Sequence, residues 1–291
     1  MLEKCILCPR ECKANRLKGD IGFCRTSEKI KIALYSVHQY EEPCISGING
    51  SGTVFFTGCN LRCKFCQNYV VSQENKGYEI SIEKLSDIFI ELQNKKVNNI
   101  NLVTGFAYVP LIIQAIEIAR EKGLNIPIIY NSSGYESVET IKMLKGYIDI
   151  YLPDFKYYYN ELGVSLSGVS NYYEVATQAL IEMKKQVGEN EFDNKGILKK
   201  GIIVRHLILP NHIQNSKRCL KWVRDNLGKK TYVSIMAQYF PTYKAKDLED
   251  VNRKITEEEL KSIREYSEKL GFENGFIQDL EEQEEQYVPN F

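Results

Sequence analysis

Residues 58–68 read Gly-Cys-Asn-Leu-Arg-Cys-Lys-Phe-Cys-Gln-Asn, and this stretch decides how the 291-residue chain is interpreted. Its cysteines, Cys59, Cys63 and Cys66, have the spacing C-x3-C-x2-C and follow the apolar run 53–56. Three thiolates on one loop can converge on one point. Iron–sulfur cubanes are normally held by four cysteines, so three ligands would leave one iron open to a substrate or cofactor. A three-ligand zinc site and a chance cluster of core cysteines are the alternatives.

The composition predicts one large globular domain, or one domain with a small appendage, because 43% of the residues are apolar and 26% are charged. Lys+Arg and Asp+Glu both number 38, so no net charge would attract nucleic acid or an anionic membrane. No apolar run approaches the ~20 residues of a membrane span, and the first residues do not open a signal peptide. We therefore expect a cytoplasmic protein whose nine cysteines stay reduced and favour metal ligation over disulfides.

Apolar runs typical of strands alternate with amphipathic helical patterns from residue 53 onward. The predicted strands are 54–57, 100–104, 126–131, 148–155, 201–209 and 232–238. The predicted helices are 82–94, 109–121, 138–144, 172–187, 216–226 and 256–270. Ser81 and Ser137 are expected N-caps, and Thr256 with Glu259 predicts a capping box.

Short connections between these segments predict parallel strands with right-handed crossovers. Six βα units fall short of the eight strands of a closed TIM barrel. The cysteine loop directly follows the first predicted strand, at the end of a strand where barrel enzymes carry their chemistry. Residues 188–200 are predicted to form an exposed loop, and the acidic stretch 281–286 a solvated tail.

At the cysteine loop the chain resembles the radical SAM superfamily, whose signature is C-x3-C-x-φ-C with an aromatic residue at φ, here Phe65. The resemblance implies a [4Fe–4S] cluster on the three cysteines, with an open iron that chelates the amino and carboxylate groups of S-adenosylmethionine (SAM). It also implies an α/β fold, an open partial (β/α)6 TIM-like barrel, which matches the six βα units. We assign this barrel to residues 46–291 and treat residues 1–45 as a Cys-rich metal-binding segment.

Polar residues at the ends of the predicted strands are the candidates for SAM contacts. They are Asn68, Thr104, Gly105, Asn131, Ser133, Asp154, Lys156 and Arg205. Asn68 would reach the nucleoside, the 104–105 turn would offer backbone carbonyls to the SAM amino group, and the 131–133 turn suits the ribose hydroxyls. Gln238 and Tyr239, after the sixth strand, are candidates for the substrate side.

Four charged or titratable positions lie in or beside the fourth and fifth strands. Asp154 and Lys156 face the same side of a strand end and resemble the Asp-Leu-Lys segment of pyruvate formate-lyase activating enzymes, in which the Lys neutralises the SAM carboxylate. A surface ion pair, worth ~0–1 kcal/mol, is the alternative. Arg205 lies in an apolar strand, so we expect the SAM carboxylate or Asp154 as its buried anionic partner. His206 faces the opposite way and is expected to be a satisfied core residue.

The chain is similar over its whole length to the pyruvate formate-lyase activating enzyme-like (PflX-like) branch of the superfamily. The similarity rests on the N-terminal cysteines, on Glu-Pro-Cys-Ile-Ser-Gly at 42–47 with Gly-Ser-Gly at 50–52, and on Pro-Asp-Phe-Lys at 153–156. Two departures stand out. Asn131 replaces an Asp that helps to hold a monovalent cation beside SAM, which argues against a cation site. Gly-Phe-Ala at 105–107 replaces Pro-Thr-His, which indicates a different substrate.

The N-terminal cysteines Cys5, Cys8, Cys12 and Cys24 have spacings that suit a second, four-ligand site. Tetrahedral zinc, rubredoxin-like iron and an auxiliary cluster all fit this pattern, and free cysteines are the alternative. A metal would compensate for the poor core of a ~25-residue segment. The remaining two cysteines, Cys44 and Cys219, are expected to be structural.

These features predict an enzyme that reductively cleaves SAM to a 5′-deoxyadenosyl radical, which abstracts hydrogen from a substrate. The substrate is either a glycyl radical enzyme, as the activating-enzyme resemblance implies, or a small molecule or peptide. The expected partners are SAM, a low-potential electron donor such as flavodoxin or ferredoxin, and no nucleic acid or membrane. A non-catalytic iron–sulfur or metal-binding protein is the alternative from a different class.

Overall fold

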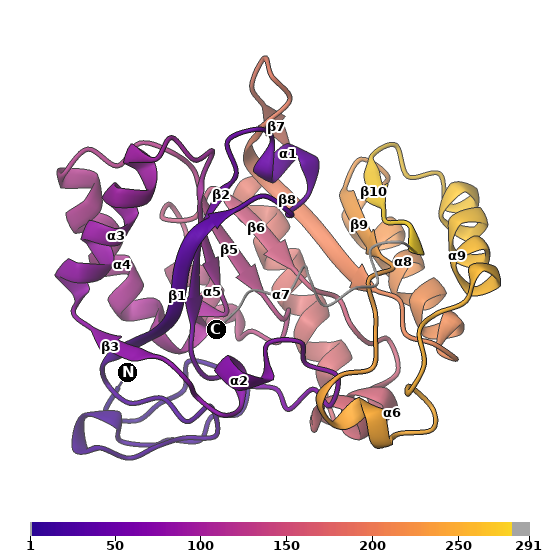
Figure 1. The fold of residues 1–291 in the computed structure, drawn as a ribbon, viewed down its shortest axis with the longest axis horizontal. Coiled ribbons are helices and arrows are strands. Elements are labelled where there is room, and N and C mark those ends of the chain that lie inside the picture. Colours follow the sequence, from indigo (N-terminus) through magenta and orange to yellow (C-terminus); the bar gives the residue numbers. More distant parts are fainter. Residues whose placement is uncertain (1, 281–291) are drawn as a thin grey trace.

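The computed structural model describes residues 2–280, which fold around one curved sheet (Figure 1). Its strands are β1 (Ile30–His38), β2 (Ser51–Phe56), β3 (Tyr78–Ile80), β4 (Ile100–Val103), β5 (Ile128–Ser132), β6 (Ile150–Pro153), β7 (Glu191–Phe192), β8 (Leu198–Leu207), β9 (Tyr232–Met236) and β10 (Gly275–Ile277). The helices are α1 (Pro43–Ser46), α2 (Tyr69–Ser72), α3 (Ile82–Asn94), α4 (Val109–Glu121), α5 (Val138–Met143), α6 (Asn160–Leu162), α7 (Tyr172–Val187), α8 (Ile213–Leu227) and α9 (Glu257–Leu270).

The sheet has the order β10-β9-β8-β6-β5-β4-β2-β1-β3, with β7 paired to β8. From β2 to β10 along this path every neighbouring pair is parallel, whereas β1 is antiparallel to β2 and β3 is antiparallel to β1. The two edges, β3 and β10, are not paired with each other, so the barrel is open. The predicted partial barrel with an α/β fold is therefore confirmed.

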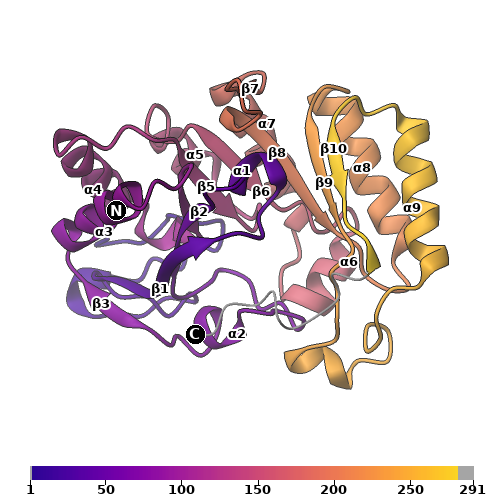
Figure 2. The same cartoon turned by 45° about the horizontal axis from the view of Figure 1, so that its top comes forward.

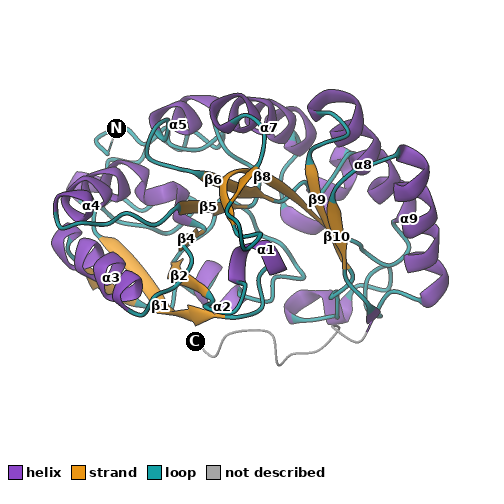
Figure 3. Ribbon diagram, turned by 90° about the horizontal axis from the view of Figure 1, so that it is seen from above, coloured by secondary structure: helices purple, strands orange, loops and turns teal. Residues whose placement is uncertain are grey.

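Helices α3, α4, α5, α7, α8 and α9 lie along the outer side of the curved sheet, while α1 lies inside it (Figure 3). The C-terminal part of the sheet and its helices lie together at one end of the molecule (Figure 2). This part consists of β9, β10, α8 and α9. All six residues of β2 are buried, and its two polar side chains, Ser51 and Thr53, donate to Asn99 Oδ1 and to Ser36 O. No helix among residues 2–280 is long and apolar enough to cross a bilayer.

The predicted elements agree with the structure except near the two ends of the barrel. The N-caps are confirmed, since Ser81 and Ser137 accept from the backbone N–H three residues on, and Thr256 forms the capping box with Glu259. The expectation of a loop at 188–200 is wrong, because β7 pairs with the first residues of β8 within this stretch. Strands β1, β3 and β10 and the short helices α1, α2 and α6 were not predicted either. The acidic stretch 281–286 lies outside the described residues.

The inside of the barrel is closed at the end where the strands begin. Residues 41–46 enter it, and Cys44 and Ile45 pack against apolar side chains of β5, β6 and β8. The buried carboxylate of Glu42 accepts from Arg205 Nε at 2.8 Å and from Nη2 at 2.6 Å, and Glu41 also pairs with Nη2. Asn101 on β4 donates to Glu41 Oε1 at 2.9 Å. We call the group formed by Glu41, Glu42, Arg205 and Asn101 the floor network.

The floor network corrects the expected partner of Arg205. Neither Asp154 nor an incoming carboxylate is needed, because two acidic residues of the chain already neutralise this guanidinium. Burial alone would lower the pKa of Arg205, but the charges of Glu42 and Glu41 raise it well above its usual range. Burial likewise works against the charged form of Glu42, yet attraction to Arg205 leaves the pKa of this carboxyl lowered.

We predict that Glu42→Gln destabilises the fold by about 3–5 kcal/mol, because it weakens the pairing of a buried guanidinium. Chemical denaturation of the variant and the parent measures the free energy of unfolding. Because the pKa of Glu42 is lowered in the fold, its stabilisation is present above the usual carboxyl pKa and is lost as the pH falls through the folded value. The difference between variant and parent should therefore shrink in acid.

The control is Asp225→Asn, which removes the exposed partner of Lys221 on α8. Exposed pairs of this kind contribute little, so the control should unfold like the parent. A Glu42→Gln variant as stable as this control would show that the floor network does not hold the barrel closed.

Candidate active site

The cysteine loop lies at the C-terminal end of β2 and is fixed on two sides. Its outgoing half pairs with the π-turn Gly163–Ser167, since Arg62 N donates to Ser167 O at 3.0 Å and Lys64 N donates to Leu166 O at 2.8 Å. At its start, Gly58 has φ +81° and a Cβ there would lie 2.4 Å from Cys24 O. Only glycine permits both that backbone conformation and that close approach.

The three thiols of the loop are buried or half-buried and each has a polar neighbour. Ser167 Oγ donates to Cys63 Sγ at 3.0 Å, Ser72 Oγ lies 3.2 Å from Cys66 Sγ, and Leu61 N donates to Cys59 Sγ at 3.4 Å. Burial raises the pKa of all three thiols, that of Cys66 to about 11, and charge on Cys63 raises the pKa values of the other two further. The three sulfurs therefore lie close enough to interact.

The surroundings of these sulfurs indicate the kind of site that they suit. Among residues 2–280, no group of three or more His, Cys, Asp or Glu side chains is placed to hold a single metal ion, at the cysteine loop or in the N-terminal segment. A cubane is ligated through different irons, so its cysteines need not share one centre. Three neighbouring, buried thiols with hydrogen-bond donors fit a polynuclear cluster.

Aromatic and amide side chains surround the end of the cysteine loop. Phe65 is buried and packs edge-on against Tyr239, with ring centroids 5.9 Å apart. Tyr239 donates its hydroxyl to Val251 O at 2.5 Å, so it is a wall of the site rather than a free polar group. Gln67 Nε2 donates to Gln238 O at 3.5 Å, which joins the end of β9 to the loop. Asn68 begins α2 without a side-chain cap hydrogen bond.

The turn after β4 has a strained backbone. Thr104 has φ +61°, and its N–H donates to Asn131 O at 2.9 Å. Gly105 is buried, and a Cβ there would lie 2.8 Å from Ile112 Cδ1. Non-glycine residues with positive φ concentrate at functional sites, where the surrounding structure holds them in place.

The turns after β5 and β6 are tied together by one phenol that the sequence did not single out. Tyr172 donates to Ser133 O at 2.8 Å and lies 3.1 Å from Asp154 O, and it accepts from Lys156 N at 2.9 Å. Gly134 has φ +75°, and a Cβ there would lie 2.1 Å from Asp154 O. The backbone around the predicted SAM residues is therefore tightly packed.

Asp154 and Lys156 form a half-buried ion pair beside the cysteines. The pair named by the surface-pair alternative is therefore present, but its side chains are only 23% and 15% exposed. Burial alone would lower the pKa of Lys156, but the charges of Asp154, Cys63 and Cys66 raise it above its usual range. The ammonium group is thus close to the three thiols, at the mouth of the barrel.

His206 is the satisfied core residue that the sequence predicted. Its Nδ1 lies 2.6 Å from Phe155 O, and its Nε2 lies 2.8 Å from Ser216 Oγ. Burial lowers the pKa of the imidazole to about 4, so it is neutral at physiological pH. Phe155 in turn packs edge-on against Trp222 of α8, with ring centroids 5.3 Å apart.

Three of the four N-terminal cysteines, Cys5, Cys8 and Cys24, lie near one another. Cys5, Cys8 and Cys24 are buried and Cys12 is exposed. Burial raises the pKa of Cys8 to about 12, with added contributions from charges on Cys24, Glu136 and Cys5. Lys13 N donates to Cys5 O at 2.9 Å and Glu11 N donates to Cys8 O at 3.0 Å, so the segment folds into tight turns.

Comparison with known families identifies the class of protein. Residues 53–255, which include the cysteine loop and the parallel strands from β2 to β9, match the radical SAM superfamily. The chain therefore belongs to the radical SAM superfamily, whose members hold a [4Fe–4S] cluster and SAM. Its marks are the cysteine loop of Cys59, Cys63 and Cys66 and the open barrel.

Relatives of known sequence come from Methanocaldococcus jannaschii. Uncharacterized protein MJ0674 is 32% identical over 94% of this chain and 77% of its own length. Uncharacterized protein MJ0808 is 26% identical over 84% of this chain and 73% of its own length.

Solved structures with a similar fold are more distant in sequence. Methylornithine synthase (PylB) is 17% identical with a TM-score of 0.51, and the match covers 75% of this chain and 60% of that one. Streptococcus suis SuiB bound to S-adenosylmethionine is 14% identical with a TM-score of 0.53, covering 76% and 48%. A spore photoproduct lyase mutant is 15% identical with a TM-score of 0.51, covering 77% and 74%. The chain thus spans about half of SuiB, and these similarities concern the fold.

Proposed function

We propose that this protein binds a [4Fe–4S] cluster through Cys59, Cys63 and Cys66 and uses it to cleave SAM. When bound, the cluster supplies an electron that splits SAM into methionine and a 5′-deoxyadenosyl radical, which abstracts hydrogen from a substrate. The observation that carries the proposal is the group of three interacting thiols with the Lys156 ammonium beside them. All four lie where the strands of an open barrel end.

Each neighbouring residue has a role in holding SAM. Lys156, oriented by Asp154, would neutralise the SAM carboxylate. The backbone of Thr104 and Gly105 would accept from the amino group, and Asn131 and Ser133 would contact the ribose. Phe65 and Asn68 belong to the wall around the nucleoside.

The substrate that we propose is a glycyl radical enzyme, on the basis of the sequence resemblance to the pyruvate formate-lyase activating enzyme-like branch. A low-potential flavodoxin or ferredoxin would reduce the cluster in the cytoplasm. A second candidate is a peptide, because the SuiB structure bound to its precursor peptide SuiA shares this fold with a TM-score of 0.51. Two measurements after incubation with SAM and a reductant distinguish these substrates: electron paramagnetic resonance and mass spectrometry. A glycyl radical signal on an added glycyl radical enzyme supports the first, and a mass change on an added peptide supports the second.

We predict that Cys66→Ala loses the ~400 nm absorption of the reconstituted cluster, or retains an unstable [3Fe] or [2Fe] species. With SAM and a low-potential reductant, the variant should form no 5′-deoxyadenosine. The matched control is Cys219→Ser, which changes a buried cysteine of α8 and should keep parental iron and cleavage. SAM cleavage by Cys66→Ala at the parental rate would refute the cluster assignment.

Lys156→Ala should weaken SAM binding about tenfold to a hundredfold while the iron content stays normal. The reason is the loss of a charge-assisted contact to a desolvated carboxylate, worth about 1.5–3 kcal/mol. Isothermal titration with SAM gives the dissociation constant. Lys122→Ala, which removes the partner of Asp87 on the outer helices, is the control. If both variants bind SAM equally well, Lys156 has no role in SAM binding.

A second metal at Cys5, Cys8, Cys12 and Cys24 belongs to the same proposal. The double variant Cys5→Ala/Cys8→Ala should lose that metal and about 2–5 kcal/mol of stability, as with the loss of a metal or disulfide staple. Elemental analysis names the metal: zinc for a structural knuckle, iron without sulfide for a rubredoxin-like site, and iron with sulfide for an auxiliary cluster. Metal content equal to the parent's would show that these cysteines are free.

A further inference from the structure

The N-terminal segment holds the cysteine loop from outside through three side chains. Arg10 and Phe23 come from that segment and Arg62 from the loop itself. Both guanidinium groups lie over the Phe23 ring, with Cζ 3.5 Å from the ring centroid for Arg10 and 4.0 Å for Arg62. Contacts of this kind between a guanidinium and an aromatic face are attractive. We call these three residues the arginine clamp.

The arginine clamp binds three consecutive carbonyl groups of the loop. Arg62 Nη1 donates to Cys59 O at 2.9 Å and to Leu61 O at 3.0 Å, and Arg10 Nε donates to Asn60 O at 2.6 Å. Arg62 Nη2 also donates to Phe23 O, which closes the clamp on itself. Arg10 Nη2 reaches Gly168 O at 2.8 Å, next to the π-turn that supports Cys63. The backbone of the first half of the loop is thus fixed by two positive groups.

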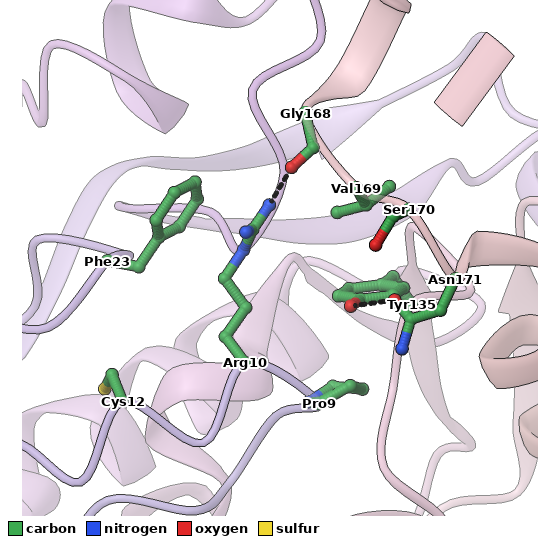
Figure 4. Close-up of a pocket in the computed structure, with 9 residues that line it drawn as sticks. All are labelled: Pro9, Arg10, Cys12, Phe23, Tyr135, Gly168, Val169, Ser170 and Asn171. Atoms are coloured by element: carbon green, nitrogen blue, oxygen red, sulfur yellow. Dashed lines mark hydrogen bonds between the residues drawn. The ribbon is translucent and has the colours of Figure 1, made fainter. Parts of the chain in front are cut away.

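Both guanidinium groups bind backbone carbonyls. Among residues 2–280, no carboxylate lies within ion-pair distance of Arg10 or Arg62. Arg10 and Phe23 form one wall of an open pocket of about 460 Å³, and none of its nine lining residues is acidic (Figure 4). Burial lowers the pKa of both guanidinium groups, whereas the charge of Cys59 acts in the opposite direction on each. Both guanidinium groups bind carbonyls at Cys59 and Asn60, so they lie beside the Cys59 ligand.

We propose that the arginine clamp sets the reduction potential of the cluster held by Cys59, so that the N-terminal segment acts on the radical chemistry through charge. This inference rests on the proposed cluster site. Reduction adds one negative charge, and two nearby positive charges stabilise the reduced form. Net charge and hydrogen bonding around a cluster are established determinants of its potential. Arg10 and Arg62 are positioning residues, since they reach the cluster only through the loop.

The test is the potential of the reconstituted cluster, measured without SAM by a redox titration followed by electron paramagnetic resonance. Arg62→Met removes one charge and keeps a long side chain against Phe23. We expect a roughly tenfold smaller equilibrium constant for reduction, which is about 59 mV toward more negative potential for one electron. Arg62→Lys keeps the charge but not the planar fork, so its potential should stay near the parent's.

Arg120→Met is the matched control. Arg120 also donates to two carbonyls, Gly146 O at 3.1 Å and Tyr147 O at 3.2 Å, and lies over the Tyr147 ring. It sits at the end of α4, which leads to the start of a strand and so to the opposite end of the barrel. This control should keep the parental potential.

Two results would overturn the proposal. One is an unchanged potential in both Arg62→Met and Arg10→Met at parental iron content. The other is an equal shift in Arg62→Lys and Arg62→Met, because charge would then not be the cause. If Arg62→Met assembles no cluster, the reduction potential of Arg10→Met tests the proposal instead. Its potential should also become more negative. A parent that assembles no [4Fe–4S] cluster would overturn the proposed function together with this inference.

Discussion

The fold depends on a buried charge that has to be neutralised inside the barrel. Arg205 projects from the strand β8 among apolar neighbours, and Glu41 and Glu42 meet it from the segment that leads into α1. Taking such charges out of water is costly unless each finds a partner in good geometry. The two-point contact between Glu42 and Arg205 supplies that geometry and holds residues 41–46 inside the barrel. This closes one end of the barrel, so chemistry is left to the end where the strands finish.

At the end of the barrel where the strands finish, the site is formed by loops that are hydrogen-bonded to one another as well as by the sheet. The cysteine loop forms backbone hydrogen bonds with the π-turn after α6, and Tyr172 joins the turns after β5 and β6. Gly58 and Gly134 allow backbones to approach at distances that any side chain would prevent. A radical intermediate needs such a fixed enclosure, because a loose one would admit water and side reactions.

The sequence carried the strongest information where local spacing determines chemistry. The C-x3-C-x2-C loop and the βα alternation were sufficient for the family and for the partial barrel. They were not sufficient for β1, whose residues alternate weakly because the strand is only half-buried at the edge region of the sheet. The partner of Arg205 was also predicted wrongly. Glu41 and Glu42 lie more than 160 residues away in sequence, and no local pattern reports a contact between such distant segments.

The packing of Phe155 against Trp222 has a practical consequence. The chain contains a single tryptophan, and its indole contacts the residue that stands between Asp154 and Lys156. Tryptophan fluorescence of this protein, excited selectively above the tyrosine absorption, therefore comes from one residue that packs directly on the charged end of β6. Because Trp222 is only 9% exposed, its emission depends on the side chains around it more than on bulk solvent. The protein carries its own optical probe of this corner of the barrel, and no label has to be introduced.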